Sequence, residues 1–177
     1  MFDDIVLEEE AIAEEREADA ARLGTAILHQ PIRELATLRP PIAVPPGAAL
    51  REAIDRMNGA HAGCVLVVER ERLVGILTER DLLTKVVGTG VDLDSSRVDQ
   101  FMTPDPETLG LDDRASYALN KMSVGGFRHI PLVDEDGAPV GVVSMRNVVD
   151  YMVDFFRTEV LNLPPAPPAE FSERDGA

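Results

Sequence analysis

Cysteine is nearly absent from this chain, since Cys64 is the only one among 177 residues. A single thiol excludes an intramolecular disulfide and a cysteine-rich metal site. Cys64 opens the apolar run 64–68, so we expect a buried structural thiol rather than a reactive one.

Long apolar runs are absent as well. A membrane-spanning helix needs about 20 consecutive apolar residues, and no stretch of this sequence approaches that length. The first residues, Met1-Phe2-Asp3-Asp4, lead into an acidic segment and lack the basic start and apolar core of a secretory signal. We therefore expect a cytoplasmic protein with no membrane partner.

Positive charge is scarce, with 17 Lys and Arg residues against 32 Asp and Glu residues and a formal net charge of −15. This balance argues against nucleic-acid binding, which relies on basic side chains that neutralise phosphates. Residues 1–22 contain nine acids and two arginines, so much of the negative charge lies in an appendage. The repeat region has a smaller net negative charge and can still offer a local site for an anion.

Motifs for catalysis and metal binding are missing. No nucleophile, base and orienting residue form a recognisable set, and His29, His61 and His129 lack the spacing of metal ligands. No glycine-rich phosphate loop occurs, since residues 124–127 are more simply a helix C-terminal stop before a strand. We expect neither an enzyme nor a bound metal or catalytic cofactor.

A repeated segment is the main positive signal. Residues 73–83 and 139–149 share one pattern, and their glycines, Gly75 and Gly141, lie 66 positions apart. A repeat of this size is a small folding unit used twice. Two such units usually enclose a cleft, and we expect the function to lie there.

The pattern around the repeat predicts the same elements in both copies. Apolar residues at helical spacing precede a short strand at 64–68 and at 129–133, and a polar turn, a second strand and a second helix follow. Proline-flanked extended pieces at 40–44 and 104–109 introduce the units and suit a sheet edge or a pocket wall. The predicted fold class is α+β. We expect the two copies, and two chains, to cover one another's sheets.

The ends of the chain differ in composition from the repeat. We expect an acidic helical extension at 1–25, exposed or packed on a partner, then unit 1 at 26–90 and unit 2 at 91–158. Four prolines between positions 164 and 168 stop any helix, so 159–177 is predicted to be a disordered Pro-rich tail.

Thr78 and Asp81 stand where the second strand of unit 1 gives way to a helix. One interpretation is a capping box, in which the Thr78 hydroxyl and the Asp81 carboxylate satisfy free amides of the first turn. The other is a ligand site, because a carboxylate here has two acceptor oxygens for a pair of ribose hydroxyls. In that case a phosphate must find its cations elsewhere.

Arg128 and His129 offer such cations at the mouth of a strand in unit 2, where unit 1 has no charged residue. Arg128 can form a bidentate pair with phosphate, and the His129 ring can add a donor. The alternative is a surface arginine and a packed histidine. Arg80 and Arg146, at equivalent places in the two units, are likewise either exposed helix residues or phosphate contacts.

These features together resemble a tandem pair of CBS domains, a family named for cystathionine β-synthase, in the arrangement called a Bateman module. The resemblance is to the stand-alone bacterial type. It covers roughly residues 27–156 and rests on the two Gly-hydrophobic-hydrophobic-Thr/Ser-x-x-Asp/Asn segments, on 101–104 and on 128–133. It implies a β-α-β-β-α fold in each unit, a pseudo-twofold between the units and often a disc-like homodimer. It also implies that AMP, ADP, ATP or S-adenosylmethionine binds between the units and regulates a protein effector.

The resemblance further implies roles for ten residues. They are Asp81 and Thr78 for the ribose, with Thr78 also near phosphate, Ile42, Ala43 and Val65 for the adenine, Arg128, His129 and Arg146 for the phosphate, and Ser144 and Asn147 for the second site. Two departures matter. Asn147 replaces the acid in unit 2, and unit 1 lacks the Arg and His pair. We therefore expect one good site per chain, built on Asp81.

Two hypotheses follow for the function. The first is a regulatory adenine-nucleotide sensor with no catalysis of its own. The second is a ligand-free homodimeric scaffold that docks a partner through its acidic helix or its tail, in which case Thr78 and Asp81 are only helix caps.

Overall fold

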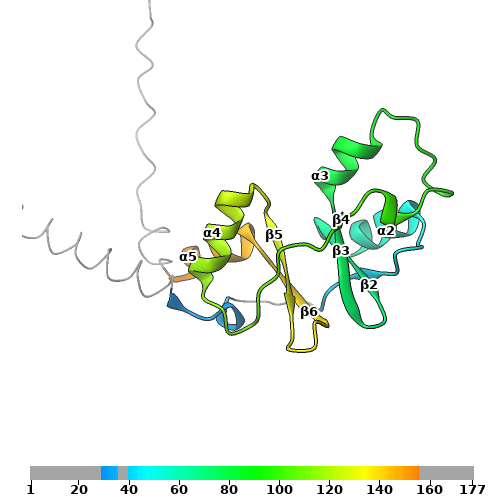
Figure 1. The fold of residues 1–177 in the computed structure, drawn as a ribbon. Helices are drawn as coiled ribbons and strands as arrows, with labels where there is room; N and C mark the ends of the chain where they lie inside the picture. The colour runs from blue at the N-terminus through cyan, green and yellow to red at the C-terminus, as the bar shows by residue number, and fades with distance from the viewer. Residues whose placement is uncertain (1–28, 36–39, 156–177) are drawn as a thin grey trace, which may run out of the picture.

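The computed structural model describes residues 29–35 and 40–155, which form two units lying side by side (Figure 1). Each unit combines helices with a small sheet, so the predicted α+β class is confirmed. The expected acidic helix and Pro-rich tail lie outside the described residues. Within those residues, no helix is both long and apolar enough to span a bilayer. Below, unit 1 means residues 40–90 and unit 2 means residues 91–155.

Unit 1 builds its core between one helix and its sheet. Its elements are β1 (Ala43–Val44), α2 (Leu50–Gly59), β2 (Cys64–Glu69), β3 (Arg72–Thr78), the short helix α3 (Glu79–Asp81) and the π-helical turn η2 (Leu82–Val86). β1 pairs parallel with β2, and β2 pairs antiparallel with β3. The buried Leu50, Ala53 and Met57 of α2 pack in one core cluster with apolar residues of this sheet, as their helical spacing predicts.

Unit 2 repeats this arrangement. Its elements are α4 (Ala115–Gly125), β5 (His129–Val133), β6 (Pro139–Ser144) and α5 (Met145–Phe155). β5 pairs antiparallel with β6, and Leu109 forms an isolated parallel bridge beside β5, as β1 does beside β2. The predicted strand at 129–133 is confirmed, and so is the turn containing Gly137, whose φ of 81° suits glycine.

The segment that leads into each unit packs on the other unit. η1 (Ile32–Glu34) precedes unit 1, yet Ile32 is fully buried in the core of unit 2, where its amide donates to the Asp113 carbonyl at 2.8 Å. Figure 1 shows this blue segment beside the helices of unit 2. η3 (Val98–Gln100) does the reverse, since Val98 lies in the core of unit 1 and its amide donates to the Ala48 carbonyl at 2.9 Å. Each core is therefore completed by a segment that the sequence assigns to the other unit.

A short strand of unit 2 extends the sheet of unit 1. β4 (Thr103–Pro104) pairs with Ile76 and Gly75 of β3. Gly75 permits this close approach, because a Cβ there would lie 2.4 Å from the sulfur of Met102. The pairing brings Thr103 beside the end of β3, where α3 begins.

A third apolar cluster lies where the two units meet. Cys64, Leu66 and Ile76 of unit 1 are buried, and Val142 of β6 packs against them. Burial raises the pKa of Cys64 to about 12, so the thiol stays protonated and serves as a packing group. The expected buried structural thiol is confirmed.

Candidate functional site

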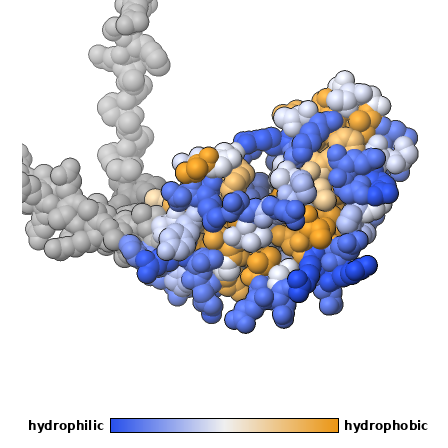
Figure 2. Space-filling model, in the orientation of Figure 1, coloured by the Kyte–Doolittle hydropathy of each residue, from blue (hydrophilic) through white to orange (hydrophobic). Residues whose placement is uncertain are grey.

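A cavity of about 390 Å³ opens between the two units. Figure 2 shows this face of the molecule hollowed between them, with hydrophilic residues around the hollow. Its lining comes from the β3–α3 junction of unit 1, from the β4 segment and from the α4–β5 loop. The lining residues are Gly63, Ile76, Thr78, Glu79, Arg80, Asp81, Thr103, Asp105, Pro106, Glu107, Gly125, Gly126, Phe127, Arg128 and His129. A cavity of this size is typical of small-molecule sites.

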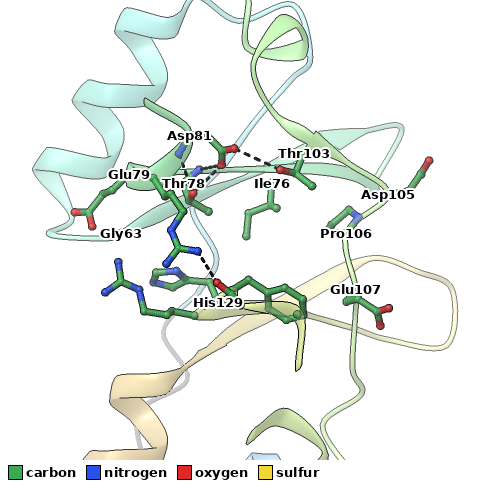
Figure 3. A pocket seen from close by; sticks show the side chains of 15 residues that line it. Gly63, Ile76, Thr78, Glu79, Asp81, Thr103, Asp105, Pro106, Glu107 and His129 are labelled. Carbon is green, nitrogen blue, oxygen red and sulfur yellow. Dashed lines mark hydrogen bonds between the residues drawn. The ribbon is translucent and has the colours of Figure 1, made fainter. Parts of the chain in front are cut away.

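Thr78 and Asp81 form the capping box that the sequence suggested. The Thr78 amide and hydroxyl donate to Oδ2 of Asp81 at 2.9 and 2.7 Å, and the Asp81 amide donates to the Thr78 hydroxyl at 3.3 Å. The cap fixes the carboxylate at the start of α3, on the wall of the cavity (Figure 3). The structural interpretation is thus confirmed, and it leaves Asp81 facing the cavity.

The other oxygen of Asp81 is held by neighbours on two different elements. Oδ1 lies 2.7 Å from Nζ of Lys85 and accepts a longer bond of 3.4 Å from the Thr103 hydroxyl. Burial raises the pKa of Asp81, but hydrogen bonds from Lys85 and Thr78 and the Lys85 charge outweigh it, and the pKa is lowered. Asp81 is therefore an ionised acceptor at neutral pH.

Unit 2 carries the same cap without the charge. The Ser144 amide and hydroxyl donate to Oδ1 of Asn147 at 2.9 and 2.6 Å, and the Asn147 amide donates back to the Ser144 hydroxyl at 3.2 Å. Neither residue lines the cavity. The repeat thus preserves the fold of the junction in both units, whereas the cavity described here uses only one of them.

Basic groups line the side of the cavity supplied by unit 2. The half-buried His129 ring lies so close to Gly63 that a Cβ on that glycine would be 3.0 Å from its Nε2 and Cε1 atoms. Burial lowers the pKa of His129, the Arg128 charge lowers it further, and Glu79 acts in the opposite direction. The imidazole is therefore neutral at neutral pH, beside the exposed guanidinium of Arg128.

Arg80 joins the two units across the cavity. Its Nη1 donates to the carbonyl of Gly126, which caps α4 in a left-handed conformation with φ of 68°. The Phe127 ring lies over Gly125, where a Cβ would sit 2.1 Å from the ring. These contacts define a wall with an aromatic ring, a guanidinium and a backbone carbonyl.

Four of the ten residues implied by the resemblance line the cavity: Thr78, Asp81, Arg128 and His129. The other six do not, namely Ile42, Ala43, Val65, Arg146, Ser144 and Asn147. Val65 is fully buried in the core of unit 1, and Arg146 is exposed on α5. The crossed packing explains the difference, because the wall facing Asp81 comes from the leading segment of unit 2 rather than from β1.

Several lining residues were not identified from the sequence. Thr103 belongs to the segment 101–104 that marked the start of unit 2, and that motif was the available signal for it. Pro106 lies in the proline-flanked piece 104–109, which the sequence predicted to suit a sheet edge or a pocket wall. Ile76 and Phe127 carry no comparable signal, since apolar residues in strands and loops are common. Only the folded chain brings them together.

The cavity combines acceptors, cations and apolar walls. It offers the capped carboxylate of Asp81, the further carboxylates of Glu79, Asp105 and Glu107, the hydroxyls of Thr78 and Thr103, two guanidiniums and an imidazole. Within residues 29–35 and 40–155, no group of three or more His, Cys, Asp or Glu residues is arranged to hold a metal ion. The arrangement suits a small polar molecule with hydroxyl and anionic groups and an apolar ring.

Comparison with known proteins identifies both copies of the repeat. The CBS domain family matches residues 32–88 and 98–154. A protein of Acidianus ambivalens, described as an uncharacterized 17.7 kDa protein, is 32% identical over 112 residues, which are 63% of this chain and 66% of that one. A CBS domain-containing protein of Arabidopsis thaliana is 30% identical over 105 residues, 59% of this chain and 19% of the relative. The chain thus spans under two thirds of these relatives.

Solved structures share the fold. A CBS domain protein from Pyrobaculum aerophilum, complexed with AMP, superposes with a TM-score of 0.63 at 27% identity over 72% of this chain and 98% of that one. A CBS-domain containing protein from Agrobacterium tumefaciens gives a TM-score of 0.63 at 26% identity over 71% of this chain and 95% of that one.

Proposed function

The chain belongs to the CBS-domain family, with two such domains in tandem, and from this premise we propose that it is a regulatory module that binds an adenine nucleotide in the cavity beside Asp81. The observation that carries the proposal is the cavity itself, where an ionised carboxylate, basic groups and an apolar wall meet. The AMP complex of the Pyrobaculum aerophilum relative supports the choice of ligand. The module has no catalytic step of its own in this proposal.

The ribose contact follows from the free acceptor positions of Asp81. A carboxylate has about four lone-pair positions. Thr78 fills two of them and Lys85 a third, while the fourth has only the long bond from Thr103. We expect one ribose hydroxyl to displace Thr103 from Oδ1 and its neighbour to pair with the released Thr103 hydroxyl. This geometry revises the simpler idea that both oxygens of Asp81 hold the diol.

The phosphate contact follows from the basic groups. Arg80 and Arg128 both line the cavity, and the neutral His129 ring can donate one hydrogen bond. A guanidinium has five donors, so Arg80 can bind an anion while one donor stays on Gly126. Glu79 lines the same cavity and acts on the charge of His129, so it opposes a large negative charge on the ligand.

The base contact follows from the apolar part of the lining. Ile76 is buried and Phe127 is partly buried, and both line the cavity together with Pro106. Figure 3 shows Ile76 and Pro106 on the Thr103 side of the cavity. A purine stacks well on such surfaces because both of its faces are apolar. Unit 2 lacks the carboxylate at Asn147, so the proposal gives one good site per chain.

A ligand panel tests this function. Titration of the purified chain with AMP, ADP, ATP and S-adenosylmethionine, followed by calorimetry and by thermal shift, is expected to show one site per chain for at least one of them. Because the ligand binds only the folded state, a concentration of 100 times the dissociation constant stabilises the protein by about 2.7 kcal/mol. Absence of binding and of any thermal shift with all four ligands would favour the scaffold hypothesis instead.

We also propose that the active form is a homodimer. Both units expose apolar residues on or directly after their last helical segment, namely Leu83 and Val87 in unit 1 and Val149, Met152 and Val153 in unit 2. Leu83 and Val87 are 66% and 65% exposed, and neighbouring exposed apolar groups mark interaction sites.

The proposed ligand also bears on where the module acts. Adenine nucleotides are cytoplasmic metabolites, so the proposal implies a cytoplasmic module, and as a regulatory module it would act on a protein effector.

The dimer is tested by mass in solution. Light scattering behind size exclusion is expected to give twice the 19.3 kDa mass of one chain. The double variant Leu83→Asp and Val149→Asp is expected to elute as a monomer, because each substitution puts a charge into the apolar contact. Substitution of the exposed Glu71, at the tip of the first hairpin, serves as the control. A wild-type mass of one chain at micromolar concentration would rule out this assembly.

A further inference from the structure

Lys85 connects Asp81 to the segment between the units. Its ammonium lies 2.7 Å from Oδ1 of Asp81 and donates to the Phe101 carbonyl at 2.8 Å. The Asp81 side chain is 13% exposed, while that of Lys85 is 41% exposed. One side of the pair is therefore shielded from water, where an ion pair keeps more of its strength than at the surface.

The pair belongs to unit 1 alone. Lys85 follows Asp81 by four residues and lies in the π-helical turn η2, a feature that is rare and often found at functional sites. The corresponding helix of unit 2 has Tyr151 four residues after Asn147. Asp81 and Asn147 make the same cap bonds, to Thr78 and to Ser144. The contact with a lysine is therefore a feature of the charged side chain, Asp81, and not of the neutral Asn147.

We propose that Lys85 is a positioning residue for nucleotide binding, which fixes Oδ1 of Asp81 next to Thr103 and balances the carboxylate charge so that the cavity accepts an anionic ligand. This inference rests on the proposed function of the same cavity. Lys85 itself does not line the cavity. It acts through Asp81, by holding one lone pair and leaving the other for a ribose hydroxyl.

The charged groups around Asp81 determine how its pKa responds when Lys85 is removed. These groups are Glu79 and Arg80 on the same turn, Lys85 on η2, and, from unit 2, Asp105, Glu107, Arg128 and His129 in the cavity wall. Burial by itself raises the pKa of Asp81, and the hydrogen bonds of Lys85 and Thr78 reverse that shift. Without Lys85 the pKa moves upward, so Asp81 takes up a proton as the pH falls and loses the acceptor that the ribose needs.

The test uses adenosine, which has no phosphate to titrate. Calorimetry at pH 7.5 and pH 5.0 is expected to give wild-type affinities within about a factor of two of each other. For Lys85→Met, the affinity is expected to fall by about threefold between the two pH values, because loss of a close opposite charge raises a carboxyl pKa by about 1–3 units, and a rise of about two units leaves about a third of Asp81 ionised at pH 5.0. Lys85→Arg is expected to restore the level profile, since it keeps the charge.

The control is Arg56→Met, which removes the guanidinium from another i,i+4 ion pair, with Glu52, outside the cavity and leaves Asp81 untouched. Its adenosine affinity is expected to follow the wild-type pH profile. Any effect of His129 protonation on affinity is common to all variants and cancels in the comparison. Identical profiles for wild type and Lys85→Met would overturn the role of Lys85 while leaving nucleotide binding intact. So would a Lys85→Arg profile that matches Lys85→Met. A wild type that binds neither adenosine nor AMP would remove the proposed function and this inference together.

Discussion

Replacing Asp81 with alanine is expected to lower the affinity for AMP by about 100-fold. The variant removes an ionised acceptor of the ribose and leaves Lys85 without its partner beside the bound ligand. Hydrogen bonds to charged groups contribute about 1.5–3 kcal/mol each, and about 2.8 kcal/mol corresponds to 100-fold. Calorimetric titration of AMP into wild type and variant measures the change.

Asn147→Ala separates this ligand contact from the helix cap. Both substitutions remove the side chain that accepts hydrogen bonds from the N-cap residue, with matching bonds in the two units. Only Asp81 lines the cavity. AMP affinity is therefore expected to survive Asn147→Ala. Equal losses in the two variants would mean that the caps, and not the carboxylate, control binding.

Ile32→Ala is expected to destabilise unit 2 by about 2–5 kcal/mol, the range for a buried large-to-small change. Ile32 is 0% exposed and packs with Leu132 and Met122 of unit 2, although it precedes unit 1 in the sequence. Urea unfolding followed by tyrosine fluorescence measures this directly, because both tyrosines of the chain, Tyr117 and Tyr151, belong to unit 2.

Glu34→Ala is the matched control for Ile32→Ala. Glu34 belongs to the same 3-10 turn but is exposed, so its loss is expected to change the free energy of unfolding by less than about 0.5 kcal/mol. If Ile32→Ala were as mild as this control, the segment would not be part of the core of unit 2.

The repeat made much of the fold predictable. Helical spacing identified α2 and α4, and the short apolar runs identified β2 and β5. The junction at Thr78 and Asp81 was also readable, because a capping box involves residues only three positions apart. The second helix of unit 1 was predicted from its apolar spacing, and in the structure it continues as the π-helical turn that contains Lys85. Its apolar spacing does not distinguish the two helix types.

The cavity was predictable only in part. Asp81 and Thr78 were found from one motif, and Arg128 and His129 from the difference between the copies. The apolar contacts assigned to Ile42, Ala43 and Val65 do not line this cavity, where Pro106 and Phe127 lie instead. The roles implied for those three residues stay a prediction, whereas the residues that face Asp81 in the cavity come from the leading segment of unit 2, whose β4 pairs with β3 and brings Thr103 to the end of that strand.

The amino-acid sequence by itself determined the two units, their main strands and helices, the cap at Thr78 and the acid at Asp81 that unit 2 replaces with Asn147. Each of these depends on interactions within a few residues or on a pattern that the chain repeats. Tertiary structure alone decided which segment completes which core, which residues face Asp81 and how Lys85 reaches both Asp81 and Phe101. Those outcomes depend on contacts between residues far apart in the sequence. An apolar segment has the same local pattern whether it packs on one unit or on the other, so the pattern does not predict which core it completes.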